Sequence, residues 1–586
     1  YSYGNKNIFF SIYDTLITDA DVIAADVKNT FATIHFIKPE TLFLTEATED
    51  FKETSYENDA TSENDNLGTF FYEDEKKDEG KSEVANSLSK KTYMGPPQAT
   101  NYTLSGIIKD KSSGEGLPFA SVQVLRSLVR SSSNVDGYFT LSKVPSDTCV
   151  LVVSYIGYNK SEIYLTPALP KSNFVIELTP SSNVLKTITI TSGREDAMLQ
   201  KKEDVSVIKL TPRQIEKLPN IGEKDVMRSF QLMPGVSASQ ESSSGLYVRG
   251  GTPDQNLVLY DGFTVYHVDH LYGYFSAFNS NVVKDIQLYK GGFESRFGGR
   301  LSSVTEITGK DGNQKKFNMG GDISLLSINA WAEIPIGNKF SSIIAYRRSY
   351  KGPIYNALFD KYSKSSTTQT AQTPQPGGPG GNRFMQNTEA TSYFHDLNGK
   401  FTYRPNLKDI LTLSIFNGND KLDNSIDNSG SSFPGGGSIS NFSISATDLT
   451  KYGNVGSSLK WSRKWNEKLY GNTLISYSNF YSDRDRSMQR TSTDASGNES
   501  TTKSGVFENN NLKDYSLKSD YQWDLFNFSQ LQFGIFVTSF DIKYTYAQSD
   551  TATLLDKKNK AILAGGYLQS KFRFLKNKLI FLPGIR

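Results

Sequence analysis

Two histidines lie close together in the middle of the chain, with an aspartate between them. His267, Asp269 and His270 have a spacing that could place two imidazoles and a carboxylate around a metal ion. The Cys or Glu residues that usually complete such a site are missing, and spacing alone identifies a metal site only weakly. We therefore expect no metal, and assign both histidines to packing or to contact with a ligand.

Other motifs of catalysis and phosphate binding are missing from the sequence. The stretch from Gly245 to Gly251 is glycine-rich, but no such loop ends in Gly-Lys-Ser or Gly-Lys-Thr to hold a phosphate. No Gly-x-Ser-x-Gly elbow with a plausible histidine partner occurs. The single Cys149 excludes an internal disulfide and a multi-cysteine zinc site. A soluble β-rich enzyme therefore lacks a catalytic constellation, and we expect neither enzymatic activity nor a cofactor.

The composition indicates a large, mainly β chain with little net charge. The 586 residues are 37% hydrophobic and carry a net charge of +2, a balance that gives no reason to expect a nucleic-acid partner. Thr, Ser, Tyr, Gly and Asn dominate the second half, which disfavours an all-helical fold. No apolar run reaches the roughly 18 residues that a membrane-spanning helix needs.

The first 180 residues divide into three predicted segments. Residues 1–45 form an uncertain small fragment, mixed or β, without a firm motif. Residues 46–100 are crowded with Asp and Glu and poor in apolar residues, which predicts a flexible acidic linker. Residues 101–180 alternate short strand-like runs with turn signals such as Asp136-Gly137, a pattern typical of a small β-sandwich.

The next segment, up to residue 315, mixes helix and strand signals. Thr211 as N-cap and Pro212 in the first turn predict a helix that ends near Leu218. A second helix is predicted over residues 223–232. Strand signals recur at 246–249, 256–260 and 286–290. We therefore predict a mixed α/β domain here.

From residue 316 to 586 the pattern is one of long strands alone. Leu411, Leu413 and Ile415 share one face of such a strand. We predict about eleven strands, each long enough to cross a bilayer when tilted. Short turns alternate with long polar loops, as is typical of an outer-membrane barrel. The long loops are Lys351–Thr391, Asp420–Thr450, Ser482–Asn511 and Ala547–Lys560.

A barrel in lipid must close, because lipid cannot satisfy an open sheet edge. Single-chain bacterial barrels normally have an even number of strands, and the last predicted strand runs to Arg586. We therefore expect the chain to hold the first half of a transmembrane β-barrel, of the plugged class with about 22 strands.

Two successive segments resemble one family, the TonB-dependent outer-membrane receptors. Four pieces of the sandwich resemble a carboxypeptidase-like regulatory domain: Ser105–Asp110, Gly116–Val122, Asp136–Phe139 and Ser154–Tyr158. Residues 187–310 resemble the receptor plug through Tyr247–Gly251, Leu257–Gly262, Lys290–Phe293 and Arg296–Arg300, and we assign the plug domain to 194–315. The resemblance implies a periplasmic sandwich without catalytic groups and a plug inside the barrel. It also implies that Arg249, Arg296 and Arg300 hold the plug to acidic groups on the barrel wall; the alternative is surface arginines beside turns.

The segment 181–193, between sandwich and plug, is a candidate TonB box. Its core is Thr187, Ile188, Thr189, Ile190, Thr191 and Ser192. Their β-branched side chains favour an extended strand, which can add to the edge of a partner's sheet through main-chain hydrogen bonds. The alternative is that this run is the last strand of the sandwich or the first of the plug.

The resemblance implies a receptor in the cell outer membrane, with its N-terminal domains in the periplasm, that imports a ligand with energy from a TonB complex. Its partners would be the TonB C-terminal domain, outer-membrane lipids and a possible surface lipoprotein. His267 and His270 would lie in an outward-facing plug loop as weak candidates for ligand contact, and the sequence does not identify the ligand. A non-transporting scaffold subunit of an outer-membrane assembly is the alternative, because a fold does not determine a function.

Overall fold

The computed structural model divides the chain into two units, Tyr1–Asn86 and Ser87–Arg586. The described residues are 97–181, 206–216, 218, 224–238, 245–271, 273–324, 326–350, 392–429, 442–493, 498–526, 529–548, 552–574 and 579–586, together with the strands of the first unit. In that unit β1 (Ser2–Tyr3) pairs with β2 (Lys6–Asn7), and β3 (Ala32–Lys38) pairs with β4 (Thr41–Glu46). Most of the predicted acidic linker lies outside the described residues.

Residues 100–178 form the predicted β-sandwich. One sheet has the order β11-β5-β8 and the other β10-β9-β6-β7. The strands are β5 (Thr100–Asp110), β6 (Ser121–Val124), β7 (Arg130–Ser132), β8 (Tyr138–Ser146), β9 (Val150–Ser154), β10 (Ser161–Tyr164) and β11 (Phe174–Leu178). Alternate residues such as Val122, Val124, Leu151 and Val153 point inward and are fully buried. This alternation is what packs two sheets face to face.

The plug is a small mixed domain with its own apolar core. Its sheet, among the described residues, has the order β12-β19-β20-β15-β16. These strands are β12 (Val207–Leu210), β15 (Asn256–Tyr260), β16 (Phe263–Thr264), β19 (Val283–Lys290) and β20 (Ser303–Gly309). The shorter elements are β13 (Val236–Ser237), β14 (Tyr247–Val248), η1 (Pro253–Gln255), β17 (Asp269–His270) and β18 (Phe275–Ser276). The central strand β20 was not predicted from the sequence.

The first plug helix begins where the sequence predicts but ends at Ile215 rather than near Leu218, and the second begins at Val226 rather than at residue 223. Helix α2 (Pro212–Ile215) follows Thr211, whose backbone N–H donates to Gln214 Oε1 at 2.9 Å. Helix α3 (Val226–Gln231) is capped by Asp225, which accepts a hydrogen bond from the Arg228 backbone N–H. Such caps satisfy N–H groups that have no partner within the helix. None of the helices in the described part of the chain has the length and apolarity needed to span a membrane.

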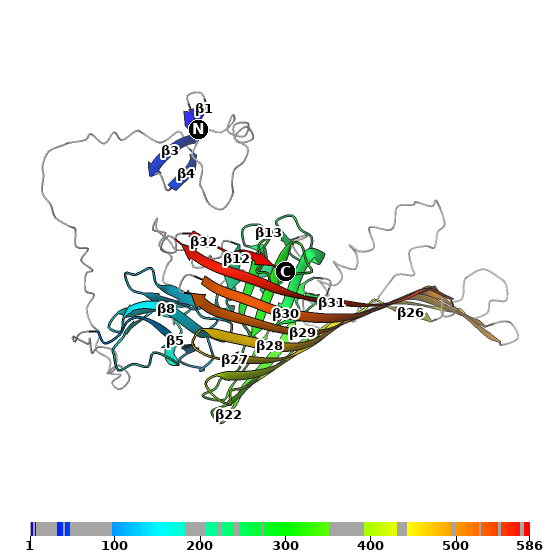
Figure 1. Ribbon diagram of the computed structural model, residues 1–586. Helices are drawn as coiled ribbons and strands as arrows, with labels where there is room; N and C mark the ends of the chain where they lie inside the picture. Colours follow the sequence, from blue (N-terminus) through cyan, green and yellow to red (C-terminus); the bar gives the residue numbers. More distant parts are fainter. Residues whose placement is uncertain are drawn as a thin grey trace, which may run out of the picture. The chain divides into compact units, whose positions relative to one another are not determined.

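The rest of the chain is one large antiparallel sheet, in which each strand pairs with the next main strand along the chain. Figure 1 shows this sheet curving around the plug, with the sandwich near one end of its strands. The main strands are β21 (Asn318–Ile323), β22 (Ser327–Ile336), β23 (Phe340–Ser349), β24 (Tyr393–Tyr403), β25 (Asp409–Asp423), β27 (Phe442–Lys464), β28 (Leu469–Thr493), β29 (Glu499–Phe526), β30 (Ser529–Gln548), β31 (Ala552–Phe574) and β32 (Leu579–Phe581). Two short pieces, β26 (Ile426–Ser429) and β33 (Gly584–Ile585), pair beside them. The mainly β fold of sandwich, plug and about eleven barrel-type strands is thus confirmed.

Several strands run further than predicted, so three of the expected loops are largely strand. In Asp420–Thr450, β25 continues to Asp423, β26 covers Ile426–Ser429 and β27 begins at Phe442. Most of Ser482–Asn511 is paired strand, because β28 and β29 stay in register from Leu469↔Trp523 to Thr493↔Glu499. Most of Ala547–Lys560 likewise belongs to β31. An antiparallel hairpin satisfies its own backbone groups, so it can continue beyond the sheet's apolar part. The loop Lys351–Thr391 lies outside the described residues.

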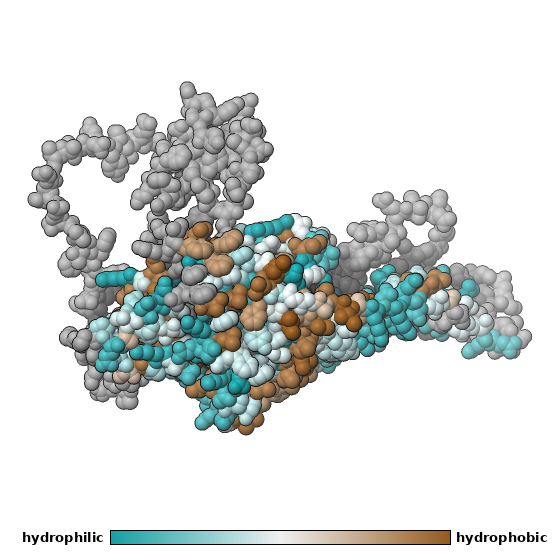
Figure 2. Space-filling view, viewed as in Figure 1, coloured by the Kyte–Doolittle hydropathy of each residue, from teal (hydrophilic) through white to brown (hydrophobic). Residues whose placement is uncertain are grey.

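The sheet has an apolar outer face and a polar inner face, the reverse of a soluble protein. In β25, Leu413 is 38% exposed, whereas its neighbours Thr412 and Ser414 are buried toward the plug. The same alternation exposes Ile344, Tyr346, Leu397, Leu459, Ile475, Leu517, Ile535, Val537 and Ile562. Figure 2 shows hydrophobic residues gathered over the strands and hydrophilic ones toward their far ends. A surface of this kind favours contact with lipid.

Candidate functional site

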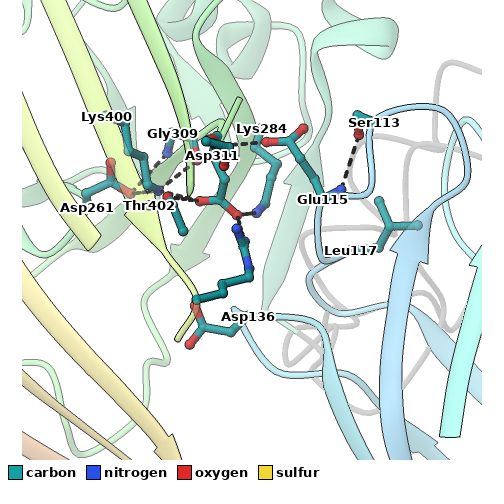
Figure 3. A network of polar contacts seen from close by, with 12 residues as sticks. Ser113, Glu115, Leu117, Asp136, Asp261, Lys284, Gly309, Asp311, Lys400 and Thr402 are labelled. Carbon is teal, nitrogen blue, oxygen red and sulfur yellow. Dashed lines mark hydrogen bonds and ion pairs between the residues drawn. The ribbon is translucent and has the colours of Figure 1, made fainter. Parts of the chain in front are cut away.

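The plug is attached to the inner face of the sheet through buried charges. Asp311 follows the last plug strand, and its carboxylate lies 3.0 Å from both Lys284 of the plug and Arg404 at the end of β24. Lys400 of β24 lies 3.3 Å from Asp311 and 2.9 Å from Asp261 of the plug. Figure 3 shows Lys284 of the plug and Lys400 of the sheet both reaching Asp311. Three cations thus surround two carboxylates.

The charges of this cluster explain how Asp311 can be buried. Burial by itself would raise the pKa of Asp311, but Lys284, Lys400 and Arg404 outweigh it and hold that pKa well below its ordinary value. The carboxylate is therefore ionised at any physiological pH. Removing one partner of such a group typically costs about 3–5 kcal/mol, because an uncompensated charge stays buried.

A glycine lets the plug approach the sheet closely beside this cluster. Gly312 has φ +80, and a Cβ there would lie 2.3 Å from the Ser342 backbone O. The backbone O of Asp311 accepts a hydrogen bond from Ser341 Oγ at 2.8 Å. A residue with a side chain would clash with β23 and be strained at this φ. The junction therefore depends on backbone contact as well as on charge.

A second cluster is built around His270, in the short plug strand β17. Its Nδ1 lies 2.6 Å from Asp420 Oδ2 and its Nε2 lies 2.8 Å from Asp396 Oδ1, both on the sheet. The ring is 1% exposed and stacks on Phe394 at 4.4 Å. Two carboxylates on two ring nitrogens require both nitrogens to be donors, which is the imidazolium form. His270 is therefore a cation that ties the plug to the barrel wall, and the ligand-contact role weakly assigned to it stays a prediction.

Burial by itself would lower the pKa of His270, but Asp396 and Asp420 outweigh it and raise the pKa to about 10. Arg347 of β23 completes the cluster, because its Nε donates to Asp396 Oδ2 at 2.6 Å and its Nη2 donates to the Ser276 backbone O at 2.8 Å. Two cations and two carboxylates therefore balance, although all four are almost fully buried.

A third set of contacts between plug and sheet joins plug residues 261–266 to strands β27, β28 and β29. Tyr266 donates its hydroxyl to Asp514 at 2.9 Å, and its backbone N–H donates to Asn454 at 3.0 Å. Ser478 and Ser458 donate to backbone oxygens of the same loop. His267, the other histidine of the predicted pair, is half-buried beside Tyr452, with ring centroids 4.4 Å apart. The two histidines thus have different surroundings.

Of the three predicted plug–wall arginines, Arg296 has its described ion pairs within the plug. Arg296 lies 2.6 Å from Glu294 and 3.0 Å from Glu306, both plug residues. Arg300 donates to the Gly299 backbone O, and Arg249 is exposed. Contact of these three with acidic groups on the wall stays a prediction. The charges that the structure does place at the wall, led by Asp311 and His270, were missed because their partners lie far away in sequence.

A cavity of about 420 Å³ lies between the plug and the inner face of the sheet. Its plug side includes Asp261, Arg296 and Arg300, and Lys460 and Lys518 belong to its sheet side. Val135 of the sandwich lies at its boundary. The candidate TonB box, residues 187–192, lies outside the described residues.

Comparison with known proteins identifies the two N-terminal domains. Residues 104–190 match the model of the CarboxypepD_reg-like domain, and residues 200–304 match that of the TonB-dependent receptor plug domain. No curated protein matches the chain.

Solved structures that match include the siderophore receptor PiuA from Acinetobacter baumannii (13% identity, 63% of this chain and 62% of that chain, TM-score 0.39). The ferric yersiniabactin uptake receptor FyuA from Yersinia pestis also matches (9% identity, 63% and 62%, TM-score 0.38). So does FpvA of P. aeruginosa, solved with a pyoverdine–iron complex (12% identity, 65% and 50%, TM-score 0.42). The chain spans less than two thirds of the length of these proteins. It contains a CarboxypepD_reg-like domain followed by a TonB-dependent receptor plug domain.

Proposed function

We propose that the protein is a TonB-dependent receptor of the cell outer membrane, which imports a ligand through a plugged β-barrel with energy supplied by a TonB complex. The observation that carries the proposal is the seating of a receptor plug domain on the polar face of a sheet whose other face is apolar. A strand needs only about 9–11 tilted residues to cross the bilayer. Strands of 20–28 residues, such as β28, β29 and β30, exceed that length.

The side of the membrane follows from the ends of the strands. The sandwich contacts the short turns of the sheet: Tyr138 donates to the Leu407 backbone O at 2.7 Å and Thr140 to the Glu467 backbone O at 2.8 Å. Outer-membrane barrels have short periplasmic turns and longer extracellular loops. The sandwich then lies in the periplasm, and the long hairpins extend outside the cell.

Energy coupling is assigned to the segment 187–192. An extended run of β-branched residues can add to the edge of the TonB C-terminal domain. A partner that pulls on this run would act directly on the plug, whose first strand begins at Val207. Outer-membrane lipids and a surface lipoprotein complete the proposed partners, the latter because long extracellular hairpins offer a surface for it.

The test uses the full-length protein purified from outer membranes and the periplasmic C-terminal fragment of TonB. Wild-type protein is expected to band with the outer membrane and to bind the fragment. The double variant Ile188→Pro and Ile190→Pro removes two backbone donors, so it should lose binding to the fragment. It should still fold and reach the outer membrane, because the changes lie between the two domains.

The matched control is Ile188→Thr with Ile190→Thr, which keeps both N–H groups and the β-branched shape and should bind normally. Normal binding by the proline variant would contradict the assignment of residues 187–192 as the TonB contact. Absence of wild-type protein from the outer membrane would remove the proposed function itself.

A further inference from the structure

Buried polar contacts join the sandwich to the plug at two places. Glu115 of the sandwich accepts a hydrogen bond from the backbone N–H of Asp311. Lys209 of plug strand β12 inserts between the rings of Phe119 and Tyr155, at 4.9 and 4.6 Å from their centroids. Its Nζ donates to the Pro118 backbone O at 3.0 Å. Lys209 is 4% exposed, so the sandwich covers a plug cation almost completely.

The sandwich also contacts the sheet, through Tyr138 and Thr140 on the short turns, through Ser105 on Lys464, and through the turn that contains Asp136. Asp136 lies 2.9 Å from Lys460 Nζ of β27 and accepts a hydrogen bond from the Tyr470 hydroxyl of β28. Val135 in the same turn borders the cavity between plug and sheet. This turn therefore occupies the end of the cavity that faces the short turns of the sheet.

One connector is held from both sides. Residues 311–315 lie in the segment that joins the last plug strand, which ends at Gly309, to the first strand of the sheet, which begins at Asn318. The sandwich holds this connector through Glu115 and through the Ser113 backbone O, which accepts from the Gln314 N–H at 2.8 Å. The sheet holds it through Lys400 and Arg404 on Asp311. Figure 3 shows Glu115 and Lys400 reaching Asp311 from different parts of the chain.

The chemistry of this interface favours one that can separate. Hydrogen bonds, ion pairs and cation–π contacts carry it, and interfaces of this polar kind between domains usually permit relative motion. Lys209 also lies 3.3 Å from Asp285, a partner within the plug that does not depend on the sandwich. Undocking therefore does not strand an unpaired charge on the plug.

We propose that the sandwich is a periplasmic clamp, anchored to the sheet by Asp136, that holds the 311–315 connector and β12 in place, so that the plug can leave the barrel wall only after the sandwich undocks. This inference rests on the proposed function in one respect, because the clamp controls the plug movement that import requires. The docked sandwich stabilises the plug through Glu115 and the cover over Lys209, and it closes one end of the cavity.

The test is hydrogen–deuterium exchange on the full-length protein in detergent, without TonB or cargo. Asp136→Lys places two lysines opposite each other, and like charges at an interface oppose docking. Exchange should rise about tenfold or more in the docking turn around Tyr138 and in plug peptides covering 207–210 and 303–315. The interior of the sandwich, such as 150–154, should be unchanged.

The matched control is the charge swap Asp136→Lys with Lys460→Asp, which restores the opposite charges and should return plug exchange close to wild type. Faster exchange at the docking turn with an unchanged plug would overturn the clamp. Unchanged exchange at both places would overturn Asp136 as its anchor. A result that contradicts the clamp does not bear on the TonB-binding test of the proposed function, because the exchange experiment contains neither TonB nor cargo.

Discussion

Ser181 and Arg213 donate hydrogen bonds to the same acceptor, the backbone O of Gly157, at 3.0 and 2.7 Å. Ser181 ends the sandwich and Arg213 lies in helix α2 of the plug, so these two residues flank the segment that contains the candidate TonB box. Arg213 also lies over the Tyr158 ring, 5.2 Å from its centroid. A force applied to that segment would therefore act on the sandwich and the plug at Gly157. If the sandwich undocks from the plug, the hydrogen bond between Arg213 and Gly157 must break.

The histidine cluster makes a prediction about plug retention. His270→Gln keeps a hydrogen-bonding side chain but removes the cation between Asp396 and Asp420. Breaking a buried ion pair from one side typically costs about 3–5 kcal/mol. We expect the plug's calorimetric transition to move to lower temperature while the sheet's transition stays in place.

His267→Gln is the control for that variant. It makes the same histidine-to-glutamine change at a ring that is only half-buried. It should change the plug transition little. Equal effects of the two variants would show that His270 is not a wall contact of special strength.

The pKa of His270 predicts a pH dependence with a definite sign. The folded-state pKa is raised from 6.5 to about 10, so the charged ring stabilises the folded plug fully below pH 6.5. This stabilisation is lost as pH rises through about 10. The melting temperature of the plug should fall between pH 8 and pH 10.5 in the wild type by more than in His270→Gln. Parallel curves for the two proteins would contradict a charged His270.

The outer face predicts where a new charge is costly. Leu413→Arg places a cation on the face assigned to lipid, where about 2–4 kcal/mol is expected near the bilayer midplane. Leu407→Arg is the control, because Leu407 is 63% exposed in a short turn at the end of the strands. We expect the first variant alone to reduce the folded fraction in outer membranes, measured by heat-modifiable gel mobility. An equal loss in both would argue against a lipid-facing sheet.

The membrane orientation predicts a protease pattern. Protease added to intact cells should cut within Lys351–Thr391 or at the tip of the hairpin between β28 and β29. It should spare the sandwich strands β5 to β11. After the outer membrane is permeabilised, the sandwich should become susceptible as well. Cleavage of the sandwich in intact cells would reverse the assigned orientation.

The local order of the chain could be read from its sequence. Period-two alternation placed Leu413 on one face of its strand and Thr412 and Ser414 on the other, and Asp136-Gly137 marked a turn. Both signals are local, because side-chain direction and turn conformation depend on neighbouring residues. The cap at Thr211 and the glycine-rich plug motifs are local in the same sense. These signals were sufficient for the mainly β fold and for the order of sandwich, plug and sheet.

Only the tertiary structure decided which charges meet. His270 binds Asp396 and Asp420, 126 and 150 residues further along the chain, and Asp311 binds Lys400. Such pairs depend on how the sheet curves around the plug, and no local pattern encodes that curvature. The ion pairs of Arg296 with Glu294 and Glu306 were likewise not predicted, and the wall contact that the resemblance implied for it stays a prediction. The length of the hairpins was also hidden, because pairing between Ser482 and Asn510 stabilises polar strands that look like loops when read singly.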